Sequence, residues 1–268
     1  MLKGIDISNW QGRAGINLSS LPQDVRFVIC RATEGISLVD EYCAKFIDTL
    51  ENDGRKWGFY HFALGLDPIQ EAEWFVYNCK KWFGHGMPVL DMERDSQISS
   101  VDNGQWCEEF ANRVHELTGI WCVIYCSALS FLPSLKNTTW LASKCPLWIA
   151  GYPYYAHDYT DEYPLYDCSP WKYAFMWQFT SQLHLDFYDG DLDGDMAYIL
   201  EKDWDEYCGG REMKPEEIAQ AVWGYDYKNT ARGGSNVYDQ AAATYDLAKR
   251  AAEAAEEALK IVKEMKEK

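Results

Sequence analysis

Residues 3–15 read KGIDISNWQGRAG, a short strand pattern followed at once by a turn. The turn after the first strand distinguishes two kinds of α/β fold. A doubly wound nucleotide-binding sheet needs a glycine-rich loop there, so that the backbone can approach phosphate groups closely. The segment DISNWQGRAG at 6–15 contains neither a GxGxxG nor a Walker loop. The first turn therefore favours a βα barrel.

Apolar runs and helix-like segments alternate over the next 170 residues. The runs lie at 27–33, 57–63, 88–93, 122–127, 147–152 and 174–180, and the helical segments at 39–52, 68–81 and 103–118. Many runs are apolar throughout, which is typical of parallel strands covered on both faces. Asp67 followed by Pro68 has the pattern of a helix start. We therefore predict an α/β fold, a TIM-like βα barrel, for residues 1–207.

The C-terminal part has a different composition. CGGREMKP at 208–215 predicts a linker, and residues 216–268 predict a small helical tail that ends in an Ala/Glu/Lys-rich helix. Small and apolar residues in this helix follow the spacing of a helix seam, over fewer than three heptads. Three roles stay open: homo-oligomerisation with another chain, packing on the barrel, or a solvated spacer.

Charge and aromatic content restrict the partner. The chain has 268 residues with a net charge of −17, and residues 1–210 carry 31 acidic against 15 basic side chains. Nucleic acid is disfavoured as a partner because phosphate binding needs a basic surface. The 12 Trp and 18 Tyr exceed the needs of a core, so some are expected to line a groove and stack on flat ligand faces, such as sugar rings or nucleobases.

Nine cysteines are present, an odd number without CxxC spacing, so neither a disulfide framework nor a zinc site is indicated. Several lie inside apolar runs, where Cys acts as a small hydrophobe, and this favours synthesis in a reducing compartment. The N-terminus lacks the apolar region of a signal peptide, and no apolar stretch is long enough to span a membrane. We expect a protein without a membrane partner.

Residues 89–95 read VLDMERD, with two acids directly after an apolar run. In a strand, Asp91 and Glu93 project from the same face because side chains alternate. Two close carboxylates repel, so that one tends to keep its proton at neutral pH, and acid–base chemistry is the usual reason for such a pair. The alternative is that both are ordinary loop acids of an acidic protein.

Other predicted strands also end in polar or aromatic residues. In a βα barrel the active site is built at the C-terminal strand ends. The residues found there are Asp6, Glu34, His61, Asp91, Glu93, Tyr125 and Gln178. His61 between two aromatics has a second interpretation as a buried, hydrogen-bonded core residue, and Glu34 as an ion-paired rim acid. Aromatics in strands are commonly core residues too.

Several short motifs occur in a fixed order along residues 3–205. They are GIDISNWQG (4–12), CRATEG (30–35), GFYHFA (58–63), LDME (90–93), VIYCS (123–127), LWIAGY (147–152) and WQF (177–179), the last followed by an acidic turn. In this order the chain resembles the family 25 glycoside hydrolases, muramidases of which many are phage endolysins. The resemblance implies a flattened βα barrel that cleaves the β-1,4 bond from N-acetylmuramic acid to N-acetylglucosamine.

The resemblance also implies roles for four acids. Glu93 would be the general acid that protonates the leaving oxygen, and Asp91 would tune Glu93 or orient the substrate 2-acetamido group. Asp6 would have an electrostatic and hydrogen-bonding role, and Asp193 would complete the set. Water, a carboxylate or the acetamido oxygen remains open as the attacking group, with the acetamido route favoured.

The late motif departs from the family pattern, which usually ends in Asn. Here LDGD has Asp193 and then Asp195, so Asp191 and Asp195 are rivals of Asp193 for the site. DGDLDGD (189–195) also resembles the start of a calcium loop, but Leu200 stands where that loop needs Glu. We therefore expect no metal and no cofactor. The substrate-binding residues expected are Glu34, Tyr60, His61, Tyr125, Trp148 and Gln178, with Tyr125 and Trp148 stacking on sugar rings.

The leading hypothesis is a peptidoglycan-hydrolysing endolysin. Such a protein would stay in the host cytoplasm until a separate pore-forming protein releases it to the cell wall. Its tail would then bind wall polymer or lead into an oligomerising helix. Two rivals are a chitinase-like glycosidase, which also ends a strand with D-x-E, and an inactive cell-wall-binding barrel. The position of Asp6 in the first strand and the late WQF argue against the chitinase, and the presence of all four acids argues against the inactive barrel.

Overall fold

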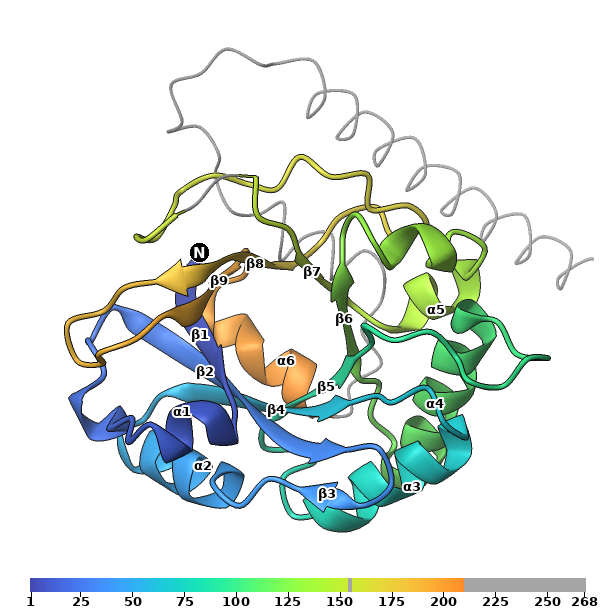
Figure 1. The fold of residues 1–268 in the computed structure, drawn as a ribbon, viewed down its shortest axis with the longest axis horizontal. Helices are drawn as coiled ribbons and strands as arrows, with labels where there is room; N and C mark the ends of the chain where they lie inside the picture. The colour runs from blue at the N-terminus through green and yellow to red at the C-terminus, as the bar shows by residue number, and fades with distance from the viewer. Residues whose placement is uncertain (154–155, 210–268) are drawn as a thin grey trace, which may run out of the picture. The chain divides into compact units, whose positions relative to one another are not determined.

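The computed structural model describes residues 1–153 and 156–209. Its β-strands form one sheet that closes on itself, because β1 pairs with both β2 and β9 (Figure 1). The ring consists of β1 (Leu2–Ile7), β2 (Val25–Glu34), β4 (Lys56–Phe62), β5 (Met87–Asp91), β6 (Val123–Ser127), β7 (Leu147–Ala150), β8 (Met176–Leu183) and β9 (Leu192–Ala197). The short β3 (Leu38–Val39) pairs with β2 outside the ring. The predicted α/β barrel is confirmed.

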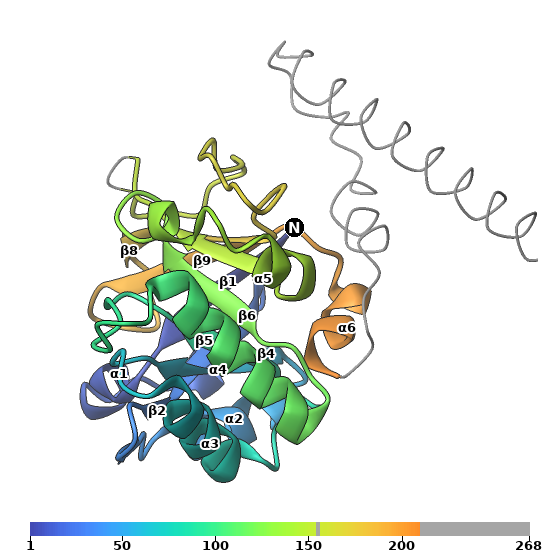
Figure 2. The same cartoon turned by 90° about the vertical axis from the view of Figure 1, so that its right-hand side faces the viewer.

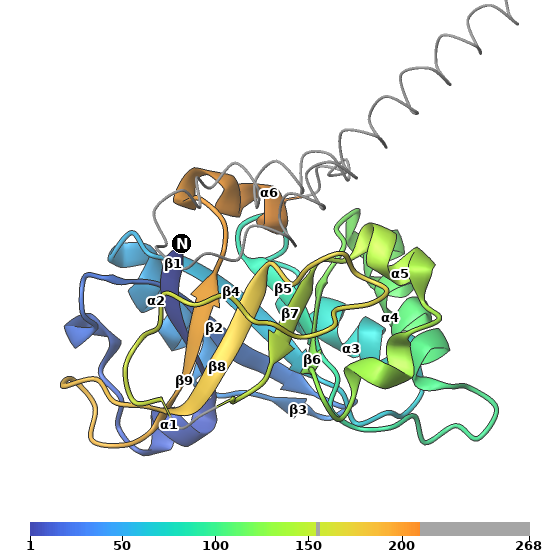
Figure 3. The same cartoon turned by 90° about the horizontal axis from the view of Figure 1, so that it is seen from above.

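Helices lie on the outside of the barrel and at its two ends. On the outside are α2 (Cys43–Asn52), α3 (Pro68–Cys79), α4 (Asn103–Thr118) and α5 (Thr139–Lys144) (Figure 2). The short α1 (Asn9–Arg13) follows β1 at one end, and α6 (Trp204–Cys208) lies at the opposite end (Figure 3). Single 3₁₀ turns occupy Leu18–Ser20, Leu132–Leu135 and Glu201–Asp203. None of these helices is both long enough and apolar enough to cross a membrane.

Local sequence signals set the helix ends. The Asp67 carboxylate accepts hydrogen bonds from the backbone N–H groups of Ile69 (2.9 Å) and Gln70 (3.0 Å), as a capping residue before Pro68 should. The helix predicted at 39–52 begins instead at Cys43, because Leu38–Val39 pair with β2 and the chain turns at residues 41–42. The predicted cap of α3 is therefore confirmed, and the start predicted for α2 is corrected.

The barrel interior is apolar at one end and polar at the other. Leu2, Phe27, Met87 and Val123, from the beginnings of their strands, are buried with Trp204 of α6. A Cβ at Gly4 would lie 2.3 Å from the Phe27 ring, so only glycine fits at that point of β1. A second apolar cluster lies between the strands and the outer helices and includes several of the nine cysteines, all of which are buried. The polar residues of the interior therefore lie at the C-terminal strand ends, where a functional site is expected.

Strand β9 is the one strand of the ring that the sequence analysis does not predict. Residues 189–195 carry four acids and two glycines, which are depleted in strands. Nevertheless Leu192–Ala197 form β9, antiparallel to both β1 and β8, while the other neighbouring pairs of the ring are parallel. The calcium loop considered for 189–195 is therefore incompatible with the fold, since residues 192–195, four of its seven, are paired strand. Within the described part of the chain, no group of three or more acidic, His or Cys side chains is arranged to hold a metal ion.

The predicted domain boundary at residue 207 stays a prediction. Apart from Cys208 and Gly209, the predicted linker (208–215) and the predicted tail (216–268) lie outside the described residues.

Candidate active site

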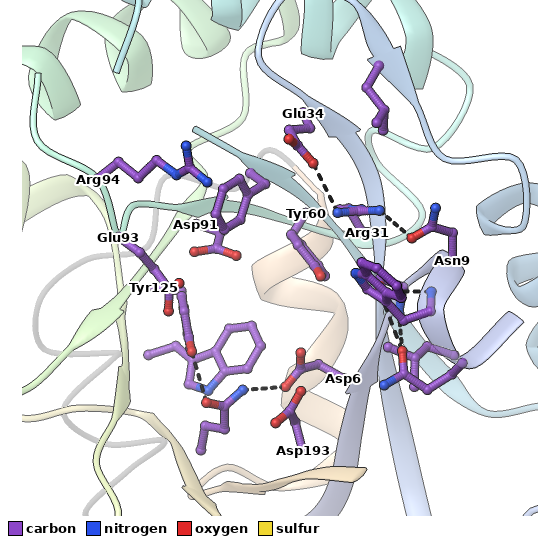
Figure 4. A pocket seen from close by; sticks show the side chains of 18 of the residues that line it. Asp6, Asn9, Arg31, Glu34, Tyr60, Asp91, Glu93, Arg94, Tyr125 and Asp193 are labelled. Atoms are coloured by element: carbon purple, nitrogen blue, oxygen red, sulfur yellow. Dashed lines mark hydrogen bonds and ion pairs between the residues drawn. The ribbon is translucent and has the colours of Figure 1, made fainter. Parts of the chain in front are cut away.

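A cleft of about 740 Å³ opens at the C-terminal ends of the barrel strands. Among its lining residues are the four candidate acids Asp6, Asp91, Glu93 and Asp193. The close-up in Figure 4 shows them around one space, contributed from different sides of the barrel. The remote sequence positions of the acids meet here because the closed sheet brings the strand ends together.

Backbone register places the acids in two pairs. Asp6 on β1 is the direct partner of Asp193 on β9, so that these two side chains share one face of the antiparallel pair. Asp91 is the last residue of β5, and Glu93 follows two residues later, exposed to the cleft. The rivals of Asp193 lie elsewhere: Asp191 bonds His184 on the surface at 2.8 Å, and Asp195 is completely buried.

Burial raises the pKa of each of the four candidate acids. Asp6 and Asp91 are each 8% exposed, and their pKa values lie well above the ordinary range, with the charges of neighbouring acids adding to the effect of burial. Removal of water, and next the Glu93 charge, raises the pKa of Asp193 to about 6. Such a group retains some protons at neutral pH, and so offers both a proton donor and a carboxylate.

Gln178 on β8 connects three cleft residues by hydrogen bonds. Its Nε2 donates to Asp6 Oδ2 at 2.6 Å, while its Oε1 accepts from the hydroxyls of Tyr125 (2.8 Å) and Tyr152 (2.5 Å). Because both tyrosines donate to Oε1, the amide can turn only its N–H group toward Asp6. The Tyr125 hydroxyl also lies close enough to Glu93 to lower its pKa, partly offsetting the effect of burial.

The opposite wall is built on Arg31 of β2. Its guanidinium forms ion pairs with Asp40 (3.2 Å) and Glu34 (3.0 Å) and donates to the Asn9 side chain. Asp40 also accepts from the Asn9 backbone N–H at 2.7 Å, which fixes the start of α1 beside the cleft. Glu34 thus lines the cleft as predicted, and it does so as the partner of an arginine.

His61 is a predicted site residue that the structure places elsewhere. It is fully buried and does not line the cleft. Its Nε2 bonds Glu71 Oε2 at 2.9 Å, its Nδ1 bonds Thr33 Oγ1 at 2.8 Å, and its ring stacks on Phe110 of α4. Tyr60 does line the cleft, and neighbouring strand residues face opposite sides, so His61 must face the helices.

The aromatic residues most open to the cleft differ from those expected to stack on sugars. Trp148 and Tyr125 line its wall but are only 2% and 6% exposed, and their rings contact each other edge-on at 4.5 Å. Trp10 (70% exposed) and Tyr152 (49%) also line the cleft and were not predicted. Two signals point to them: Trp10 lies in the first turn of the helix after the first strand, and Tyr152 ends the run at 147–152.

Neutralising Asp91 should stabilise the fold while removing activity. Its folded-state pKa is raised above the unfolded value of about 3.9. The stability that it contributes is therefore full below about pH 4 and is lost as pH rises toward the folded-state pKa. Asp91→Asn should raise the free energy of unfolding at pH 7 by on the order of 1 kcal/mol, with no gain at pH 4.

Urea denaturation of Asp91→Asn at the two pH values measures this difference, with Asp48→Asn, an exposed acid of α2, as the control. An equal change in the free energy of unfolding at both pH values would show that ionisation of Asp91 does not destabilise the fold.

Comparison with known proteins gives consistent matches. The sequence model of glycosyl hydrolases family 25 matches residues 5–186. The autolytic lysozyme of Clostridium acetobutylicum is 29% identical over 157 residues, covering 56% of this chain and 45% of that protein, so the chain spans less than half of that relative. The bacterial lysozyme from Streptomyces coelicolor superposes with a TM-score of 0.66 at 24% identity, over 78% of this chain and 97% of that one. The catalytic domain of endolysin ply40 from bacteriophage P40 of Listeria monocytogenes gives a TM-score of 0.60 at 25% identity, over 78% and 98%.

Proposed function

The chain belongs to glycosyl hydrolases family 25, and on this basis we propose that it is a muramidase of bacterial peptidoglycan. The bond cleaved is the β-1,4 bond from N-acetylmuramic acid to N-acetylglucosamine. One observation carries the proposal: Asp6, Asp91, Glu93 and Asp193 line a single cleft at the strand ends. Glycoside hydrolysis needs a protonated and an ionised carboxyl near the scissile bond, and packed acids with raised pKa values provide both.

Glu93 is the general acid in this proposal. Of the four candidate acids it is the most accessible to a substrate in the cleft. Partial burial still raises its pKa, which favours the protonated form that the step requires. Asp6 on β1 and Asp193 on β9 lie side by side on one face of the strand pair. They supply negative charge as positive charge develops on the sugar. Asp91 tunes Glu93 or orients the substrate acetamido group.

The biological role proposed is that of an endolysin. The likeness to the catalytic domain of endolysin ply40 supports this role, as do nine buried free cysteines, which suit residence in a reducing cytoplasm before release to the wall. The proposed oligomerisation or wall binding by the tail concerns residues outside those described.

Digestion of two substrates separates this function from its rivals. Purified peptidoglycan should release soluble muropeptides, and chitin oligomers should stay intact. Cleavage of chitin oligomers alone would favour a chitinase-like glycosidase. Binding to peptidoglycan without release of any fragment would favour an inactive wall-binding barrel.

Trp10 is expected to act as a binding platform for a sugar ring. It is 70% exposed and lines the cleft, so replacing it removes ligand contact with little loss of packing. Trp10→Ala should raise KM for soluble glycan fragments roughly tenfold, equivalent to about 1.4 kcal/mol, with kcat nearly unchanged. Trp10→Phe should retain most of the affinity.

The matched control for Trp10 is Tyr77→Ala, which removes an aromatic residue that is 81% exposed on α3 and does not line the cleft. Equal KM values for the two alanine variants would contradict a role of Trp10 in binding.

A further inference from the structure

Asp195 is a buried acid that the proposed mechanism does not use. It lies on β9, opposite Gly4 of β1 and Gln178 of β8, and is completely buried beneath the cleft. Neither of its oxygens has a standard hydrogen-bond partner, and neither does the Trp148 indole N–H. The register of β1 and β9 places Asp195 diagonally opposite Asp6 on the same face of the pair, and both Asp6 and the Trp148 indole affect the pKa of Asp195. These unpaired atoms require an explanation, because burying a polar atom without a hydrogen bond destabilises the fold.

Two ionised carboxylates offer only acceptors, so contact between them becomes a hydrogen bond only if one keeps a proton. No ion pair among residues 1–153 and 156–209 involves Asp6 or Asp195, so no cation offsets a second negative charge here. The titratable groups that act on Asp195 are Asp6 on β1, Asp193 on its own strand and the hydroxyls of Tyr152 and Tyr159. Burial and the two neighbouring acids raise the pKa of Asp195 well above its ordinary value.

The direction of the surrounding hydrogen bonds identifies which acid holds the proton. Tyr125 and Tyr152 donate to Gln178, and Gln178 donates to Asp6 at 2.6 Å. This chain ends at Asp6 and stabilises its ionised form. Asp195 receives no such donor from Gln178. The indole N–H of Trp148 lowers the pKa of Asp195, but burial and the charges of Asp6 and Asp193 raise that pKa by more. The proton therefore belongs on Asp195.

We propose that Asp195 is a protonated positioning residue that donates a hydrogen bond to Asp6 from the buried side of the strand pair. This hydrogen bond keeps Asp6 ionised and fixes the orientation of its carboxylate in the cleft. The inference rests on the proposed function, in which Asp6 supplies negative charge to the reacting sugar. Asp195 itself does not reach the cleft, since it is fully buried and is not among the lining residues.

Two substitutions of Asp195 have opposite consequences if this is correct. Asp195→Asn keeps size and supplies an amide N–H to Asp6, so kcat on soluble peptidoglycan fragments and the acid limb of its pH profile should stay near the wild type. Asp195→Ala removes the donor, so that the Asp6 pKa rises and the acid limb moves up by about one pH unit, a roughly tenfold loss of rate on that limb. Asp191→Asn, a surface acid of the same segment, is the control.

The contrary result is equally specific. If Asp195 is ionised, both variants remove a negative charge beside Asp6, and the acid limb moves to lower pH in both. A common downward shift, or two unchanged profiles, would overturn the proposal.

Infrared spectroscopy tests the proton without relying on activity or on the alanine variant folding. The difference spectrum between wild type and Asp195→Asn at pH 7 should contain the C=O stretch of one protonated carboxylic acid. A carboxylate band in its place would overturn the inference. If the wild type hydrolyses no glycan, the proposed function fails, while the infrared band still decides the state of Asp195.

Discussion

Glu93→Gln should lower the rate of peptidoglycan hydrolysis by about 10²–10⁴-fold, the usual contribution of a positioned general acid. The amide keeps the shape of the side chain but cannot give a proton to the leaving oxygen. Because Glu93 is exposed to the cleft, the free energy of unfolding should change little. Release of soluble muropeptides and urea denaturation measure the two quantities.

The pH profile adds a second test of Glu93. As the acid, Glu93 must be protonated, so wild-type activity should fall as pH rises through its raised pKa. Residual activity of Glu93→Gln should lack this limb. The control is Glu109→Gln, a half-buried acid of α4 that accepts a hydrogen bond from Gln105 and lies outside the cleft. Activity of Glu93→Gln within threefold of that control would refute its role as the acid.

Glu71→Ala should destabilise the fold by about 3 kcal/mol or more, since it leaves one buried and two part-buried donors unpaired, at about 1–3 kcal/mol each. Glu71 is fully buried on α3. Its carboxylate accepts from His61 Nε2 (2.9 Å) and from the backbone N–H groups of Leu64 (3.0 Å) and Leu66 (2.7 Å). Urea denaturation should show a lower midpoint with an unchanged slope.

The same substitution should also lower activity through the loop that carries Glu93. Gln97 binds the segment held by Glu71, through its backbone N–H to the Gly65 carbonyl (2.7 Å) and its side chain to the Leu64 carbonyl (2.8 Å). Glu73→Ala is a matched control two residues along α3, because Glu73 makes a surface ion pair with Arg113, worth about 1 kcal/mol at most. An equal loss in the free energy of unfolding for both substitutions would show that the buried hydrogen bonds of Glu71 stabilise the fold no more than a surface ion pair does.

Much of the barrel was predictable because its parallel strands are buried on both faces and therefore read as apolar runs. Strand β9 escaped prediction for the opposite reason. Leu192–Ala197 includes two acids and a glycine, and only pairing with β1 and β8 makes it a strand. Tertiary contacts overrode local propensity there. One of these two acids, Asp193, lines the cleft.

Asp6, Asp91 and Glu93 were predictable from a single rule, that barrel strands end at the active site. Asp193 was expected only from the resemblance to the family 25 glycoside hydrolases. The prediction for His61 failed where that rule was applied without side-chain alternation, since Tyr60 and His61 cannot both face inward. Trp10 and Tyr152 lie beyond the strand ends, in segments whose course depends on contacts distant in sequence, such as Arg31 with Asn9. Sequence periodicity has no information on such contacts.

The most direct test of the account identifies the sugar at the new chain end after digestion of purified peptidoglycan. Reduction of the digest followed by mass spectrometry labels the reducing end that hydrolysis creates. Cleavage of the bond from N-acetylmuramic acid to N-acetylglucosamine predicts reduced muramic acid in every new end. Reduced glucosamine ends would contradict the account, because they would mean that the cleft hydrolyses the other glycosidic bond of the same polymer.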